Sequence, residues 1–200
     1  AETSPGAGTP VELTGHGANK YWRLPFTSTR DTITSITPTT IPASDGKVYL
    51  EPGVYPSISV ICPTVFSPGI YFIQGSIDFG QNQAVTATGG VMFVMLGESS
   101  DIHINSNSVV TLSGIDTALL QSNYSYTAAN ADKLDGMLFW DTNSDQDFTL
   151  NGNSELHLSG GFYMPHREAT FNGNSTADGN CMTIAADKIK IEGNFSLSNF

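Results

Sequence analysis

A recurring unit in the second half of the chain constrains the fold more than any other feature. From about residue 50 onward, a glycine followed by a run of apolar or aromatic residues returns at Gly53, Gly69, Gly90, Gly136 and Gly161. After most of these runs comes a short strand in which every second residue is apolar, at residues 77–79, 102–104, 148–150, 169–171 and 189–191. Such a period predicts that equivalent segments stack on one another.

Asparagine and glycine follow these alternating strands at similar places in successive units. The corners begin at Asn105, Asn151, Asn172 and Glu192, and a further short strand follows, as at residues 109–112, 155–158 and 195–197. Asn and Gly tolerate the left-handed backbone conformation, so a short corner built from them bends a strand without ending its pairing. Three short strands per unit predict an all-β chain folded as a right-handed parallel β-helix, a solenoid in which equivalent Asn side chains form a ladder.

The spacing of the glycines fits one coil per unit, with one exception. Gly69 and Gly90 are 21 residues apart, and Gly136 and Gly161 are 25 apart, whereas 46 residues separate Gly90 from Gly136. We assign the excess to an excursion loop at residues 115–135, with a helical turn near residues 128–134. A β-sandwich is the alternative fold, because it also has many short strands. It does not explain corners that recur at the same place.

The first part of the chain lacks the repeat. Residues 1–48 include a Thr- and Pro-rich stretch, and we expect them to form an N-terminal extended cap over a β-helix at residues 49–200. A cap is needed because an open end of a solenoid exposes its core and its strand edges.

The charge balance excludes some partners. Eight Lys and Arg stand against 19 Asp and Glu, a net charge of −11, and the cations form no stripe, so we expect no nucleic-acid partner. An anionic membrane surface is disfavoured for the same reason. Residues 1–10 do not resemble a signal peptide, and no apolar run approaches the roughly 20 residues that a membrane span needs.

One loop resembles the start of a calcium site. Asp141, Asn143, Asp145 and Asp147 place oxygen ligands at every second residue. The EF-hand pattern then fails, because Gln146 stands where that loop needs glycine. The four residues are a calcium candidate, with a solvated loop as the alternative, and no other cofactor is expected.

The chain offers no convincing catalytic set. Asp78 and Asp101 alternate with core residues and are expected to face outward on one surface, as paired carboxylates of a polysaccharide-cleaving enzyme would. A cleft for acidic sugars also needs cations, and no Lys or Arg lies between Lys47 and Lys133. We therefore predict a protein that is not an enzyme. His103 lies in the middle of an alternating strand and is expected on the solvent face, as is His157.

Two further pairs of residues are candidates for other roles. Cys62 and Cys181 are compatible with one disulfide or with two buried thiols. Tyr124 and Tyr126 lie in the excursion loop, where we expect them to be exposed and to form a contact surface.

The order of motifs along the chain resembles a known family. The series consists of Pro52-Gly53-Val54-Tyr55, Pro68-Gly69-Ile70-Tyr71, Gly89-Gly90-Val91-Met92-Phe93, Gly136-Met137-Leu138-Phe139, Gly161-Phe162-Tyr163-Met164-Pro165, Cys181 with Ile184-Ala185-Ala186-Asp187, and Gly193-Asn194. It resembles the C-terminal extracytoplasmic region of TadG-like proteins, which accompany the tight-adherence (Tad/Flp) pilus machinery of bacteria. The resemblance implies a membrane anchor preceding this region, outside the present chain, and no catalytic residues.

These observations lead to one main functional expectation and one alternative. We expect a non-enzymatic extracytoplasmic module of a pilus-assembly, tight-adherence or surface-adhesion protein, in the periplasm or on the cell surface. Its partners would be other pilus or envelope proteins. The alternative is a β-helix protein that binds glycans or cleaves polysaccharides.

Overall fold

A computed structural model shows that the chain is mostly β. It describes residues 10–13, 22–25, 41–42, 47–105, 107–124, 126–151, 155–172, 176–178, 181–192 and 196–198. Two short helices, α2 (Thr117–Tyr124) and α3 (Ala128–Leu134), are the helices of this part. Neither is long or apolar enough to cross a bilayer. The prediction of a β-rich fold is confirmed, with a large parallel sheet at its centre.

The strands form one small antiparallel sheet and one 16-stranded sheet. In the small sheet, β1 (Pro10–Leu13) pairs with β2 (Trp22–Pro25). In the large sheet, β3 (Ile41–Pro42) is antiparallel to its neighbour β4 (Val48–Leu50). All other pairs described in the large sheet are parallel.

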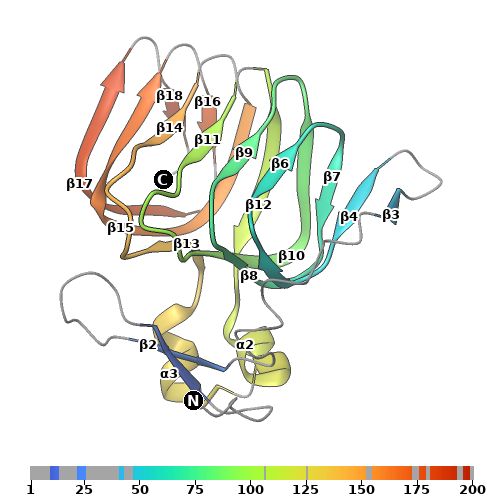
Figure 1. The fold of residues 1–200 in the computed structure, drawn as a ribbon, viewed down its shortest axis with the longest axis vertical. Helices are drawn as coiled ribbons and strands as arrows, with labels where there is room; N and C mark the ends of the chain where they lie inside the picture. The colour runs from blue at the N-terminus through green and yellow to red at the C-terminus, as the bar shows by residue number, and fades with distance from the viewer. Residues whose placement is uncertain are drawn as a thin grey trace.

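The parallel pairs arrange the strands in three columns (Figure 1). The first column holds β4, β7 (Thr64–Phe66), the start of β10 (Ala84–Met95), β12 (Val109–Gly114), the start of β15 (Glu155–Asn172), β16 (Thr176–Asp178) and β18 (Ser196–Ser198). The second holds β5 (Gly53–Tyr55), β8 (Gly69–Ile73), the end of β10, β13 (Met137–Asp141), the middle of β15 and the start of β17 (Met182–Glu192). The third holds β6 (Ile58–Val60), β9 (Ile77–Phe79), β11 (Ile102–Ile104), β14 (Phe148–Leu150), the end of β15 and the end of β17.

The chain visits the three columns in the same order each time, and we call each passage a repeat unit. The first unit consists of β4, β5 and β6, and the sixth consists of β16 and β17. The fourth unit contains the insertion with α2 and α3, between β12 and β13. Register is kept between units, so that Ile77 lies opposite Ile102, which in turn lies opposite Phe148. In the third column, residues at equivalent sequence positions therefore lie over one another.

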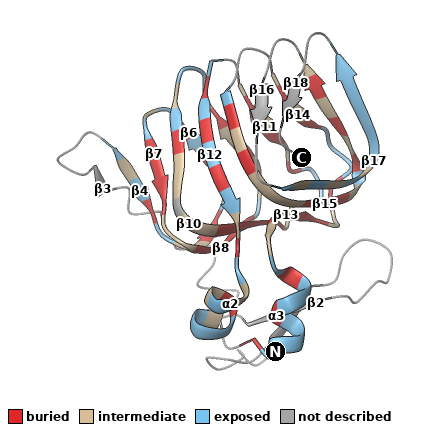
Figure 2. Ribbon diagram, turned by 180° about the vertical axis from the view of Figure 1, so that it is seen from behind, coloured by how far each residue is buried: buried red, intermediate tan, exposed pale blue. Residues whose placement is uncertain are grey.

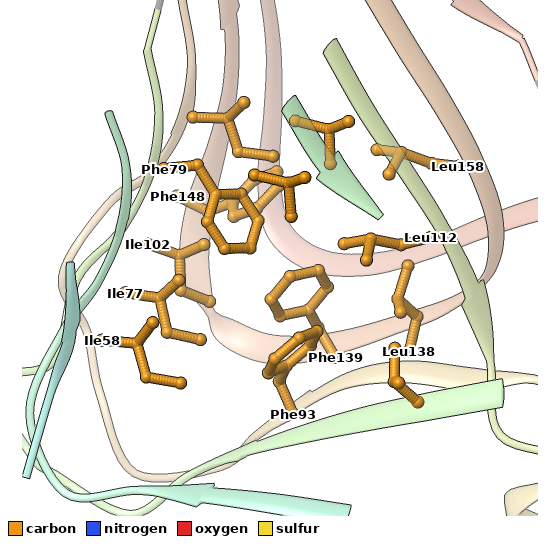
Figure 3. Close-up of a cluster of buried hydrophobic side chains, with 14 of the residues drawn as sticks. Ile58, Ile77, Phe79, Phe93, Ile102, Leu112, Leu138, Phe139, Phe148 and Leu158 are labelled. Carbon is orange, nitrogen blue, oxygen red and sulfur yellow. The ribbon is translucent and has the colours of Figure 1, made fainter. Parts of the chain in front are cut away.

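Apolar side chains fill the space between the three columns (Figure 3). Side chains from the third column, such as Ile77 and Ile102, point toward Phe93 and Phe139 of the second. The second column contributes a row of rings, in which Phe139 stacks on Phe93 at 5.1 Å and on Phe162 at 5.2 Å between centroids. Ring stacking adds to the burial of apolar area, which is the main stabilising term.

A second apolar cluster lies on the outer side of the second column. Here Val54, Phe72, Val94 and Trp140 are buried together with residues of the insertion, among them Leu120 and Leu134. Both faces of this column are therefore covered, and its strands are almost continuously apolar, as is usual for strands buried on both sides.

The corners agree with the predicted role of asparagine where the structure describes them. Asn107 has a φ of 60°, in the left-handed region. Asn172 Nδ2 donates to Asn151 Oδ1 at 3.4 Å, joining equivalent corner positions of successive units. The remaining predicted corner residues at 152–154, 173–175 and 193–195 lie outside the described residues.

Two segments with predicted boundaries are the cap at residues 1–48 and the excursion at residues 115–135. Most of the expected cap at residues 1–48 lies outside the described residues, and its capping role stays a prediction. The excursion at residues 115–135 contains α3 where a helical turn was expected, and also α2, which was not expected.

Asp116 precedes α2, and its Oδ1 accepts from the Leu119 backbone N–H at 2.7 Å. This is an N-cap contact that explains where the helix begins.

The stacked ring row yields a stability prediction. Replacing the fully buried Phe139 with Ala is expected to lower the free energy of unfolding by about 3–5 kcal/mol, because it leaves a cavity between two stacked rings. Thr149→Ala, on the outer side of the third column, is the control and should change it by no more than about 0.5 kcal/mol. Urea denaturation measures both variants, and equal effects would contradict the assignment of Phe139 to the interior.

Candidate functional site

The acidic loop predicted to bind calcium follows β13 in the fourth repeat unit. Its first residue, Asp141, is buried, and its Oδ1 accepts from the backbone N–H groups of Asn143 at 2.7 Å and Ser144 at 3.0 Å. Its other oxygen, Oδ2, faces Arg167 of the fifth unit, at 2.9 Å from Nε and 2.5 Å from Nη2. Both Asp141 oxygens are thus engaged within the protein.

Arg167 also contacts Ser100, which lies in the third repeat unit, so the contact joins the third, fourth and fifth units. Its side chain is fully buried, and Nη2 donates to the backbone oxygen of Ser100 at 2.6 Å and to Ser100 Oγ at 3.0 Å. Nη1 donates to the backbone oxygens of Gln146 at 2.8 Å and Asp147 at 3.2 Å. A guanidinium has five N–H donors in a fixed plane, and this one satisfies loops of the third and fourth units at once.

These contacts give the acidic loop a structural role. A buried charge is tolerated when it is paired and hydrogen-bonded, and Asp141 and Arg167 meet both conditions. We call Ser100, Asp141, Ser144 and Arg167 the arginine cluster. Ser144 belongs to it because its Oγ donates to the backbone oxygen of Ser100 at 2.9 Å.

The first residue of the predicted calcium site, Asp141, is therefore paired with Arg167. Asp145 and Asp147 are exposed, and Asn143 Nδ2 donates to the Leu96 backbone oxygen at 3.4 Å. Among the described residues, no group of three or more His, Cys, Asp or Glu side chains is arranged to hold a metal ion. Calcium binding by Asp141, Asn143, Asp145 and Asp147 stays a prediction.

A polar strip runs along the outer side of the third column. In β9 and β11 the flanking isoleucines and phenylalanine are buried, whereas Asp78 and His103 are partly exposed and lie opposite each other in register. Their outward orientation was predicted from the alternation and is confirmed. Asp101 Oδ2 lies 4.0 Å from His103 Nε2, and Asn105 Nδ2 donates to Asp78 Oδ1 at 2.5 Å.

The polar strip, defined as Asp78, Asp101, His103 and Asn105, can donate and accept hydrogen bonds at a solvent-facing sheet surface. A second outward histidine lies on the first column, where His157 Nε2 is 3.1 Å from Glu155 Oε1. Its predicted solvent-facing position is likewise confirmed, because both neighbouring leucines are buried.

The predicted exposure of the two insertion tyrosines is wrong. Tyr126 is buried and Tyr124 is partly buried, because the insertion folds back onto the apolar outer side of the second column. The Ile70 backbone N–H donates to Tyr124 Oη at 2.7 Å. Burial raises the pKa of both phenols, and both stay neutral at physiological pH. A role for either ring in binding a partner stays a prediction.

The disulfide predicted as one alternative for Cys62 and Cys181 is not formed. Both are free cysteines, Cys62 partly buried and Cys181 exposed, so the alternative of two buried thiols is not met either. Cys62 lies between the first and second repeat units and Cys181 lies in the sixth. At about 4.8 Å per strand, four units separate them by about 19 Å, whereas a disulfide requires Cα atoms within about 7 Å.

Sequence reasoning missed Arg167, although a signal was present. Arg167 follows Asp141 by 26 residues, close to the 25 between Gly136 and Gly161. A cation one unit beyond a carboxylate is expected to lie over it in a stack with constant register. The period brings Arg167 close to Asp141, but the strand register, in which Trp140 lies opposite Tyr163, does not by itself pair the two residues.

The arginine cluster yields a second stability prediction. Arg167→Met leaves the buried Asp141 carboxylate without its partner and is expected to cost about 3–5 kcal/mol of unfolding free energy. Combining it with Asp141→Leu removes the unpaired charge, and we expect the double variant to be more stable than Arg167→Met alone. Chemical denaturation of both variants checks this, and a loss below about 0.5 kcal/mol for Arg167→Met would contradict the buried pair.

Comparison of the chain with models of protein families, with curated proteins and with solved structures finds no match. We therefore infer function from the residues and contacts of this chain.

Proposed function

We propose that the large sheet is a right-handed parallel β-helix. The order in which the chain visits the three columns, and the register kept between units in the third column, support a coil that repeats about a common interior. The right-handed sense is supported by the strong preference of parallel strand connections for that hand. Within this fold, the insertion with α2 and α3 is an excursion from the fourth coil.

We propose further that the chain is a non-enzymatic module that acts through protein contacts. The observation that carries this proposal is the filled interior, where apolar side chains from all three columns meet (Figure 3). A filled interior directs binding to the outer surface. The arginine cluster supports the same view, because its polar groups are engaged with one another.

The cellular setting is proposed from the series of motifs that resembles TadG-like proteins. In that setting the module stands in the periplasm or on the cell surface, and other pilus or envelope proteins are its partners. The resemblance also implies a membrane anchor in a longer protein. An acidic exterior suits such a module, since a net charge of −11 keeps a strand-rich surface soluble.

A glycan-binding function is the second candidate, and the polar strip favours it. Asp78 and Asn105 are joined by a hydrogen bond at a solvent-facing surface of parallel strands, which is the kind of arrangement that contacts sugar hydroxyls. Of the described cations, only Lys190 occupies this outward row, at its far end. The strip therefore suits neutral glycans better than acidic ones.

A retention assay separates the two candidates. The purified chain is immobilised and exposed to an envelope extract that has been treated with protease, with periodate, which destroys sugar diols, or with neither. The measured quantity is the amount of extract material retained on the immobilised chain. We expect this retention to survive periodate and to be lost after protease.

The opposite pattern would favour the glycan candidate, and Asp78→Asn with His103→Ala should then abolish retention, while Thr170→Ala, farther along the same outward row, should not. A reducing-sugar assay on polysaccharides completes the test. Turnover that Asp78→Asn or Asp101→Asn abolishes would overturn the non-enzymatic proposal.

A further inference from the structure

The insertion leaves the fourth repeat unit and returns to it at a single point. The Ile115 backbone N–H donates to the Met137 oxygen at 3.0 Å, and the Gly136 N–H donates to the Ile115 oxygen at 2.7 Å. The two backbones lie so close together here that a Cβ added to Gly114 would collide with Gly136. Because both ends meet at this point, the part between them can move without drawing β12 and β13 apart.

The strands on either side of the insertion are held by other strands. β12 pairs with β10 on one side and with β15 on the other, and β13 does the same. Figure 2 shows α2 and α3 outside the sheet, joined to it by the two ends of the insertion, with exposed residues in both helices. Helices of eight and seven residues are too short to be stable alone, so α2 and α3 depend on packing against the second column.

The insertion packs on apolar side chains that belong to other repeat units. Val54 of the first unit, Phe72 of the second and Val94 of the third are at most 5% exposed, and we call them the apolar strip. They form one cluster with Leu120 and Leu134 of the insertion, on the outer side of the second column. Moving the insertion away would take these two leucines off the apolar strip and open the strip to water.

One side chain inside this cluster opposes the packing. Tyr126 is 8% exposed, and its hydroxyl is buried with no hydrogen-bond partner among the described residues. By contrast, Tyr124 Oη accepts from the Ile70 backbone N–H at 2.7 Å. A buried hydroxyl without a partner loses its hydrogen bonds to water and gains none in exchange, so it destabilises the state in which it is buried. Water can bind the hydroxyl once the insertion has moved away.

We infer that the insertion is a hinged cover, which opens as one unit between Ile115 and Gly136 while the repeat units stay folded. In the closed state the cover buries the apolar strip, and in the open state it exposes the strip to solvent. The Tyr126 hydroxyl shifts the balance toward the open state, because only there does it find hydrogen-bond partners. Local opening of this kind is expected of a segment that is held by few contacts. The inference concerns this chain alone and goes beyond the proposed function.

Lys133 makes the opening measurable. It lies in α3 and is the only Lys or Arg, and therefore the only trypsin site, between Lys47 and Arg167. The bond that trypsin cuts joins Lys133 to Leu134, which is fully buried in the closed state. Trypsin needs an extended segment, so this cut requires α3 to leave the column and unwind. The rate of the cut then follows the population of the open state when opening and closing are fast.

Limited proteolysis of the full chain under native conditions tests the inference, with mass spectrometry following the cut after Lys133. Tyr126→Phe removes the unpaired hydroxyl and is expected to slow this cut by about tenfold. Leu120→Ala weakens the packing of the cover and should speed the cut by at least about tenfold. Phe148→Leu is the control, because it weakens the interior, in the cluster that the insertion does not join, and should leave the rate of the cut unchanged.

Three results would overturn the inference. A faster cut after Lys133 in Phe148→Leu would show that trypsin acts only once the whole chain has unfolded. An unchanged or faster cut in Tyr126→Phe would show that the hydroxyl does not oppose closing. Complete resistance of Lys133 to trypsin in Leu120→Ala, under conditions in which the repeat units stay folded, would show that the insertion does not open by itself.

Discussion

Register between parallel strands is the constraint on which the rest of this structure depends. Because each strand lies directly over the equivalent strand of the previous unit, a residue type repeated in the sequence becomes a continuous row in space. Inward rows of isoleucine and phenylalanine build the interior, and the ring row through Phe93, Phe139 and Phe162 fills its centre. A shift of one residue would turn every inward side chain outward, so burial and register stabilise each other.

The arginine cluster shows how the stacking of successive units also brings polar groups together. Arg167 reaches Asp141 and Ser100 only because their loops lie at the same corner of successive units. The bonds made there cross between units, where β-ladder pairing is interrupted by loops, and they hold three units together. The interior is apolar and the polar groups of this cluster are satisfied by one another.

The alternation of apolar and polar residues along single strands was sufficient to predict which side chains face inward and which face outward in the third column. Period-2 patterns at residues 77–79 and 102–104 gave the correct inward and outward sides, because side-chain direction in a strand depends only on sequence position. Burial of Tyr126 was not predictable in the same way, since it depends on the insertion packing against a column whose outer side is apolar. The uniformly apolar run at Gly69–Ile73 was the available sign that both faces of that column are covered. Of the candidate sites, the polar strip was predicted in orientation, whereas the partner of Asp141 was missed.

Disulfide trapping across one repeat unit tests the stacked register most directly. Thr149 and Thr170 lie opposite each other on neighbouring strands of the third column, where Cα atoms are about 4.8 Å apart. In a chain with Cys62 and Cys181 changed to serine, Thr149→Cys with Thr170→Cys should form a disulfide under mild oxidation, detected as a loss of free thiols in the intact monomer. His103→Cys with Thr170→Cys spans two strands, about 9.6 Å, and should not. A cross-link in the second pair but not in the first would contradict the stacked units described here.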